Sequence, residues 1–301
     1  MSKYIHAVPN FSDGKREEVI EAVVDQLRGT EGVKLIDYYP DANFNRTVIE
    51  VIGRPKPLKQ ALLKMAGKSY KLINMEEQQG AHPRIGAQDT IPLFPLANIS
   101  LEECVQLAEE IGQEIFERFN VPVYFSGENA RSPERKNLDY IRKGQYEGLK
   151  EVAHLPERSP DIGPAALHST AGATIVSAAA SGLVAINIIL NVEDVNIAKS
   201  IAKAVRGPSG GFSTVRAIGL ALKEKNQVAV SANMFDTDNT PIFRVFNFVE
   251  NEARRYGVNV VGTQIVGCLP QEALVNCAEH YLRLENFNRD QIIEKHMVLG
   301  L

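Results

Sequence analysis

His82-Pro83-Arg84, within the glycine-rich stretch 80–90, places a titratable ring and a fixed charge on either side of a proline. The chain has only 6 histidines, and an imidazole that titrates near pH ~6.5 can both accept and donate a proton at cellular pH. Pro83 would stiffen the backbone beside the ring, and Arg84 would add a fixed positive charge. The pattern also fits a loop histidine bonded to a backbone carbonyl, because only the loop position favours chemistry. Spacing assigns no partner carboxylate, and Asp89 is merely the nearest.

Polar residues at the ends of expected strands are further candidates. Arg46 follows Asn45 at the start of a β-branched run, and a planar guanidinium can bind a carboxylate at two points. Asn10 ends the first expected strand. Each has an ordinary alternative as an exposed strand arginine or a turn asparagine. If the strand ends meet, Asn10, Arg46 and His82 would converge.

Other catalytic and metal-binding patterns are missing from the sequence. Cys104, Cys268 and Cys277 form no CxxC pair, and no HxH or HExxH spacing occurs, so no metal site is expected. A GxSxG nucleophile motif is also missing. The stretch from Gly207 to Gly211 lacks the GK[ST] ending of a phosphate-binding loop, which favours a plain helix-to-strand connection.

Composition excludes several classes of protein. A net charge of -4 provides no basic field for nucleic acid. The most apolar stretch, 171–190, is interrupted by polar residues, so it is expected to form strands rather than a membrane span. An odd cysteine count without an apparent secretory signal favours the cytoplasm. The length of 301 residues suggests two domains.

Hydrophobic periodicity predicts the order β-α-β-β-α-β in both halves of the chain. The first half would use strands 4–8, 33–38, 47–52 and 90–96 and helices 15–27 and 55–73, extended by helix 101–119 and strand 121–125. The second half would use strands 183–191, 214–222, 228–232 and 258–266 and helices 195–205 and 240–256. This split βαβ order predicts an α+β fold of two ferredoxin-like subdomains, each an antiparallel sheet covered by helices. The turn-rich region 127–172 precedes the boundary, so we expect domains 1–178 and 179–301.

Five motifs that follow one another along nearly the whole chain carry a family resemblance. They are Val8-Pro9-Asn10-Phe11-Ser12-Asp13-Gly14, Asn45-Arg46-Thr47-Val48, His82-Pro83-Arg84-Ile85-Gly86-Ala87, Asp161-Ile162-Gly163-Pro164 and Val261-Gly262-Thr263-Gln264-Ile265-Val266-Gly267. With these five motifs in order, the sequence resembles the glutamate formiminotransferase (glutamate formimidoyltransferase) family in its stand-alone form. Any one motif alone would be a weak signal. The resemblance implies transfer of a formimino group from N-formimino-L-glutamate to N5 of tetrahydrofolate, with release of L-glutamate, in histidine degradation and one-carbon metabolism. It also implies a homodimer.

The resemblance also implies roles for individual residues. The catalytic histidine falls on His82, and tetrahydrofolate is a co-substrate with no metal. Arg46 and Arg84 are candidates to bind the glutamate carboxylates or the glutamyl tail of folate, and Asn10 and Asn45 to orient the amidine. The folate-contacting stretch falls on Gly163, Pro164, Ala165, Ala166, Leu167, His168, Ser169, Thr170, Ala171 and Gly172.

Two departures from animal relatives affect these expectations. Those relatives are often fused to a cyclodeaminase, whereas this chain ends at Leu301, so we expect that activity to come from a separate protein. Some also carry an aspartate where this chain has Tyr39, and Asp37 or Asp41 would have to replace it.

Two other functions remain open at this point. The first is formyl transfer between 5-formyltetrahydrofolate and glutamate. An amidinium is charged where a formamide is not, so a carboxylate facing the substrate would favour formimino transfer. The second is a non-catalytic module that binds folate or an amino acid, because split βαβ domains often only bind ligands.

Overall fold

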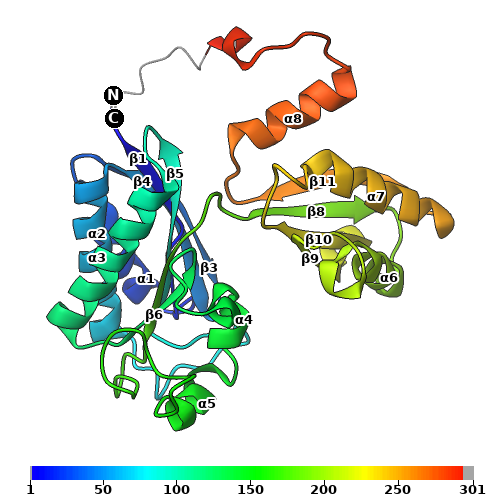
Figure 1. Cartoon of the computed structure of the whole chain (residues 1–301). Coiled ribbons are helices and arrows are strands. Elements are labelled where there is room, and N and C mark those ends of the chain that lie inside the picture. Colours follow the sequence, from blue (N-terminus) through cyan, green and yellow to red (C-terminus); the bar gives the residue numbers. More distant parts are fainter. Residues whose placement is uncertain (1, 294–301) are drawn as a thin grey trace. The chain divides into compact units, whose positions relative to one another are not determined.

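The computed structural model describes residues 2–293, which divide into two compact units with the boundary after Ala180 (Figure 1). Each unit has its own sheet and its own hydrophobic core. The second predicted domain, 179–301, extends beyond the described residues. None of the helices in residues 2–293 is long and apolar enough to cross a bilayer.

The first unit is built on a 7-stranded sheet with the order β1-β4-β2-β5-β7-β6 and with β3 paired to β4. Most pairs are antiparallel, but β7 runs parallel to both β5 and β6. Its strands are β1 (Tyr4–Ala7), β2 (Asn10–Phe11), β3 (Val33–Asp41), β4 (Arg46–Gly53), β5 (Gln88–Ala97), β6 (Val123–Gly127) and β7 (Thr174–Ala178). Its helices are α1 (Glu17–Val24), α2 (Pro55–Leu72), α3 (Leu101–Phe119), α4 (Leu138–Ile141) and α5 (Gln145–Val152).

Helices α1, α2 and α3 cover one face of this sheet and share its main core (Figure 1). Helix α3 begins at a capping box, in which the Ser100 side chain accepts the Glu103 amide and the Glu103 side chain accepts the Ser100 amide. Apolar residues at helical spacing bury its inner side, among them Leu107, Ile111 and Ile115. A smaller apolar cluster joins Tyr124 of β6 and Ile175 of β7 to Ile141 of α4 and Leu149 of α5.

The second unit is a 4-stranded antiparallel sheet in the order β11-β8-β10-β9. Helices α6 and α7 contribute buried residues to its core. The chain order β8-α6-β9-β10-α7-β11 is the split βαβ order, so the predicted fold class is confirmed. The elements are β8 (Val184–Leu190), α6 (Val195–Val205), β9 (Val215–Leu222), β10 (Gln227–Met234), α7 (Ile242–Arg255), β11 (Val260–Val266) and α8 (Gln271–Leu282).

One local alternative is wrong, and one region holds more regular structure than the sequence shows. The alternative of a turn at Asn10 is wrong, because Asn10 lies in strand β2 and pairs with both Val48 and Thr90. The turn-rich region 127–172 also contains the short helices α4 and α5. These helices have 4 and 8 residues, too few to show a long apolar period in the sequence.

Candidate functional site

The segment that carries His82 lies between α2 and β5, and buried hydrogen bonds hold it at Ile85. The amide of Ile85 donates to Asp89 Oδ1 at 2.7 Å, and its carbonyl accepts the amide of Ala173 at 3.1 Å. The next residue, Gly86, has no room for a side chain, because a Cβ would lie 2.0 Å from the Ala173 carbonyl oxygen. The loop is therefore fixed against the segment that leads into β7.

His82 faces the guanidinium of Arg46, which lies at the start of β4. His82 Nε2 and Arg46 Nη1 are 2.5 Å apart, and the Phe44 ring meets the imidazole edge-on at 5.9 Å. A guanidinium can only donate hydrogen bonds, so Nε2 must be the acceptor and the neutral ring carries its proton on Nδ1. The Pro83 carbonyl is near the ring, but Nδ1 has no partner in hydrogen-bond geometry within residues 2–293.

The surroundings keep His82 neutral. Its pKa is lowered from the ordinary 6.5 to about 4, first by burial and then by the positive charges of Arg46 and Arg142, while Asp89 opposes the shift. The pKa of Arg46 is also lowered, to about 10, first by burial and then by Arg142. At pH 7 His82 is thus an uncharged ring that can accept a proton.

Arg142 is a member of this site that no sequence motif revealed. It follows α4, and its Nη2 lies 2.5 Å from Asp89 Oδ2. Asp89, which sequence reasoning named only as the nearest carboxylate to His82, is 1% exposed. Residues Asn10, Arg46, His82, Asp89 and Arg142 are called the His82 cluster below.

Buried polar atoms without partners gather in the His82 cluster. The described part of the chain has four such side-chain atoms, namely Asn10 Oδ1, Arg46 Nε, His82 Nδ1 and Arg142 Nε. Asn10 belongs with them because it pairs with Val48, two residues after Arg46, and its Nδ2 donates to the hydroxyl of Thr90, next to Asp89. An unpaired buried polar atom costs roughly 1–3 kcal/mol. Their concentration around a neutral histidine marks a place where a polar ligand would supply the missing bonds.

Arg84 is buried, and its five N–H donors all have protein acceptors. Nε and Nη2 donate to the Oε1 and backbone O of Gln78 at 2.6 and 2.8 Å. Nη1 donates to Gln145 Oε1 at 2.8 Å, and both terminal nitrogens bind the Glu147 carboxylate at 2.7 and 2.9 Å. No donor of Arg84 is therefore free for the predicted contact with a substrate carboxylate. Its position ties the His82 segment to α5.

Asn45 also has its side chain occupied. Its Oδ1 accepts the Gly14 amide at 3.0 Å, and its Nδ2 donates to the Gln79 carbonyl at 2.8 Å. The residue adopts a positive φ of 49°, a conformation that asparagine tolerates better than most residues. Asn45 thus braces the turn that precedes Arg46.

The two acidic residues proposed to replace a missing aspartate differ in position. The charge of Asp41 raises the pKa of Arg46, so Asp41 lies within electrostatic reach of the His82 cluster. Its Oδ1 also accepts the amides of Asn43 and Phe44 at 2.8 and 2.9 Å. Asp37 is exposed.

The stretch predicted to contact folate is anchored at its start by Asp161. This carboxylate binds Arg135 Nη1 at 2.6 Å and accepts the Phe125 amide at 2.7 Å. The predicted stretch itself then runs along the surface. Six of its ten residues are exposed, namely Gly163, Pro164, Ala165, Ala166, Ser169 and Thr170.

The end of the same stretch forms a tight turn against the His82 segment. His168 and Gly172 exchange backbone hydrogen bonds of 2.9 and 3.1 Å, and His168 Nδ1 accepts the amides of Thr170 and Ala171. Gly172 in turn forms a bridge with Gly86. Leu167 packs on buried apolar residues. The structure thus places the predicted folate stretch beside the loop that carries His82.

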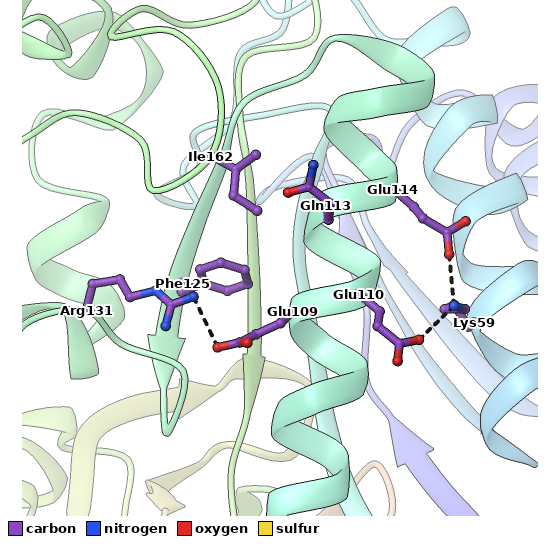
Figure 2. Close-up of a pocket in the computed structure, with 8 residues that line it drawn as sticks. All are labelled: Lys59, Glu109, Glu110, Gln113, Glu114, Phe125, Arg131 and Ile162. Carbon is purple, nitrogen blue, oxygen red and sulfur yellow. Dashed lines mark hydrogen bonds and ion pairs between the residues drawn. The ribbon is translucent and has the colours of Figure 1, made fainter.

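A pocket of about 460 Å³ on the outer side of α3 is a separate feature, because none of its lining residues belongs to the His82 cluster (Figure 2). Lys59 lies 2.8 Å from both Glu110 and Glu114, and Arg131 lies 3.1 Å from Glu109 (Figure 2). The three carboxylates of this pocket outnumber its two cations, and both cations are already paired.

The glycine-rich stretch 207–211 in the second unit has no free amides to cradle a phosphate at its end. The amides of Gly210 and Gly211 donate to the carbonyls of Gly207 and Arg206 at 3.0 and 3.1 Å. A neighbouring pocket of about 470 Å³ includes Arg206 and Arg216. Within residues 2–293, no three His, Cys, Asp or Glu side chains are grouped so that they could hold a metal ion.

Comparison with known proteins decides the family. The N-terminal subdomain of the formiminotransferase domain matches residues 4–179, and the formiminotransferase domain model matches residues 184–299. The chain belongs to the formiminotransferase family. Among other members of this family, it is 37% identical over 299 residues to the glutamate formimidoyltransferase of Streptococcus pyogenes serotype M1, covering 99% of this chain and 100% of that one.

Other relatives separate two lengths of formiminotransferase. The glutamate formimidoyltransferase of Thermoplasma acidophilum is 37% identical over 295 residues, with 97% of each chain covered. The formimidoyltransferase-cyclodeaminase of Gallus gallus is 40% identical over 290 residues, covering 95% of this chain but 53% of that protein. This formiminotransferase-family chain thus spans about half the length of the relative whose name includes a second activity.

Proposed function

We propose that the protein is a glutamate formimidoyltransferase, which moves the formimino group of N-formimino-L-glutamate to N5 of tetrahydrofolate and releases L-glutamate. Similarity along the full length of two proteins with that name supports the reaction. The observation that carries the proposed site is the neutral His82 among buried polar atoms that lack partners. An uncharged base and unsatisfied donors are what a proton-transfer site for an anionic substrate needs.

The proposed chemistry has two proton transfers. The N5 lone pair attacks the amidine carbon, and His82 accepts the proton that N5 loses as the new bond forms. The tetrahedral intermediate then collapses, and the same imidazole returns a proton to the departing glutamate nitrogen as the C–N bond breaks. Such acid–base catalysis contributes about 10²–10⁴-fold. Holding both substrates in place can contribute up to about 7–11 kcal/mol.

Through Arg46, substrate binding would make His82 a better proton acceptor. In this structure its Nη1 occupies the Nε2 lone pair, which is the pair a base must use. A substrate carboxylate that binds Arg46 would draw the guanidinium away and neutralise its charge. The first effect frees Nε2, and both effects raise the pKa of His82 part of the way towards ~6.5, the range in which an imidazole transfers protons best.

The remaining roles are assigned by proximity and by family. Asn10, whose Oδ1 has no partner among the described residues, would orient the amidine, and residues 163–172 would contact folate beside the His82 segment. Asn45 and Arg84 would act by bracing the loops on which Arg46 and His82 stand. A homodimer is proposed from the family resemblance, whereas a cytoplasmic location and subdomains 1–178 and 179–301 are proposed from the sequence.

The experiment that tests this function offers two donors to one preparation. Purified protein receives tetrahydrofolate with either N-formimino-L-glutamate or N-formyl-L-glutamate, and the folate product is identified by mass while glutamate is quantified. We expect 5-formiminotetrahydrofolate with the first donor only. Product from the formyl donor alone would replace the proposal with formyl transfer, and folate binding without any product would replace it with a binding role.

A further inference from the structure

We propose that Arg142, held in place by Asp89, is a second carboxylate-binding residue that acts together with Arg46 on the amino-acid substrate. The proposal rests on the proposed function only in taking the substrate to be a glutamate derivative with two carboxylates. It assigns Asp89 a positioning role rather than a contact with substrate.

The first argument is the incomplete bonding of Arg142. Its side chain is 13% exposed, and Asp89 is its hydrogen-bond partner through Nη2. Nε is buried and has no partner within the described residues. A guanidinium carries five donors in one plane, so Arg142 is held at one side and keeps donors for a second anion.

Arg84 provides an internal comparison for this argument. It is buried near the same loop, but Gln78, Gln145 and Glu147 use its five donors. Arg84, whose contacts are all within the protein, is therefore fully bonded. Arg142 differs in this respect, because its Nε, like the Nε of Arg46, has no partner among residues 2–293.

The second argument is how Asp89 is used. One carboxylate oxygen accepts the Ile85 amide at 2.7 Å and the other binds Arg142 at 2.5 Å. Both oxygens are committed, so Asp89 cannot turn to meet a substrate. Asp89 thus fixes both the backbone of Ile85, three residues after His82, and the guanidinium of Arg142.

The third argument is electrostatic. The charge of Arg142 lowers the pKa of both Arg46 and His82, so the two cations lie close enough to repel across the site. A bound anion would relieve this repulsion. A glutamate-type ligand has two carboxylates and can therefore offer one to each arginine, which a monocarboxylic amino acid cannot.

The test measures direct binding as well as turnover. L-Glutamate, L-glutamine and γ-aminobutyrate are titrated calorimetrically into wild type, Arg142→Gln and Arg142→Lys. L-Glutamine lacks the γ-carboxylate of L-glutamate, and γ-aminobutyrate lacks the α-carboxylate. A charge-assisted contact predicts that Arg142→Gln weakens L-glutamate binding by about 10–100-fold, with partial rescue by lysine. The same substitution should change little for the analogue that lacks the carboxylate bound by Arg142. In turnover, KM for the amino-acid substrate should rise more than kcat falls.

Asp89→Asn tests the positioning role with a readout that a merely structural role would not move. Because Asp89 holds Arg142 in place, its replacement should weaken L-glutamate binding, although the loss of a negative charge alone would favour an anion. The pKa of His82 should also fall further, since Asp89 opposes that shift. Thermal unfolding of each variant, with the exposed Arg118→Gln as a matched control, separates these effects from misfolding.

The outcomes distinguish this inference from the proposed function. Equal losses for all three ligands, or no loss with L-glutamate in folded Arg142→Gln, would overturn the role of Arg142 while leaving the transferase reaction intact. Arg142-dependent binding of L-glutamate in a protein that transfers no group would support the inference and remove the proposed function.

Discussion

Replacing Arg46 with glutamine should raise the pKa of His82, and the structure sets the size of the effect. The lowered pKa, about 4 against an ordinary 6.5, corresponds to roughly 3 kcal/mol of disfavour for the charged ring. Burial is the largest cause and stays in the variant, while Arg46, at 2.5 Å, comes next. The substitution should therefore restore only part of the shift, about 0.5–1 pH unit.

The assay is a proton NMR titration of the imidazole Cε1–H signals. The chain has 6 histidines, and the signal that disappears in His82→Asn assigns the ring. We expect the wild-type signal to stay in its neutral position down to pH ~5, the Arg46→Gln signal to begin moving at higher pH, and Arg118→Gln to match wild type. Saturating L-glutamate should raise the wild-type pKa and have less effect in Arg46→Gln. A wild-type midpoint at pH ~6.5 that changes neither in Arg46→Gln nor on addition of glutamate would refute the reasoning.

Three further outcomes are expected. Gly172→Ala should destabilise the protein in chemical denaturation by about 1–3 kcal/mol from its positive φ alone. The loss should be larger still, because a Cβ would lie 2.2 Å from the Ile85 carbonyl oxygen. The control Gly148→Ala, inside α5 and with no atom near its Cβ, should be neutral or stabilising. The free energy of unfolding should fall as pH drops from about 6.5 towards 4, because His82 is protonated more readily in the unfolded chain than in the folded one. This contribution is at most about 3 kcal/mol, and smaller for a half-buried ring. It should be missing in His82→Asn. Asp161→Asn should weaken tetrahydrofolate binding several-fold in fluorescence titrations, since the carboxylate anchors the start of the 163–172 stretch; unchanged affinity would separate that stretch from folate.

Much of the fold is readable from the sequence because its elements are long and periodic. Helix α3 matches the predicted 101–119, since a capping box begins it and apolar residues recur along one face. Helix α6 likewise matches 195–205. Strand β2 was missed because two residues show no alternation, and only the pairing of Asn10 with two neighbours makes them a strand.

The site is readable only in part. His82 and Arg46 stand in motifs, and the strand ends that carry Asn10 and Arg46 do lie on neighbouring strands. Arg142 could not be found, because its contact with Asp89 joins positions 53 residues apart and depends on the short helix α4. The occupied donors of Arg84 were equally hidden, because its partners come from α5 and from the loop after α2.

The most direct test of the central claim is the steady-state rate of glutamate release from N-formimino-L-glutamate, with and without tetrahydrofolate, in wild type and in His82→Asn. The account predicts release that requires both substrates and a kcat about 10²–10⁴-fold lower in the folded variant, with little change in KM. Near-normal turnover in His82→Asn would contradict the assignment of His82 as the acid–base group around which the site is built.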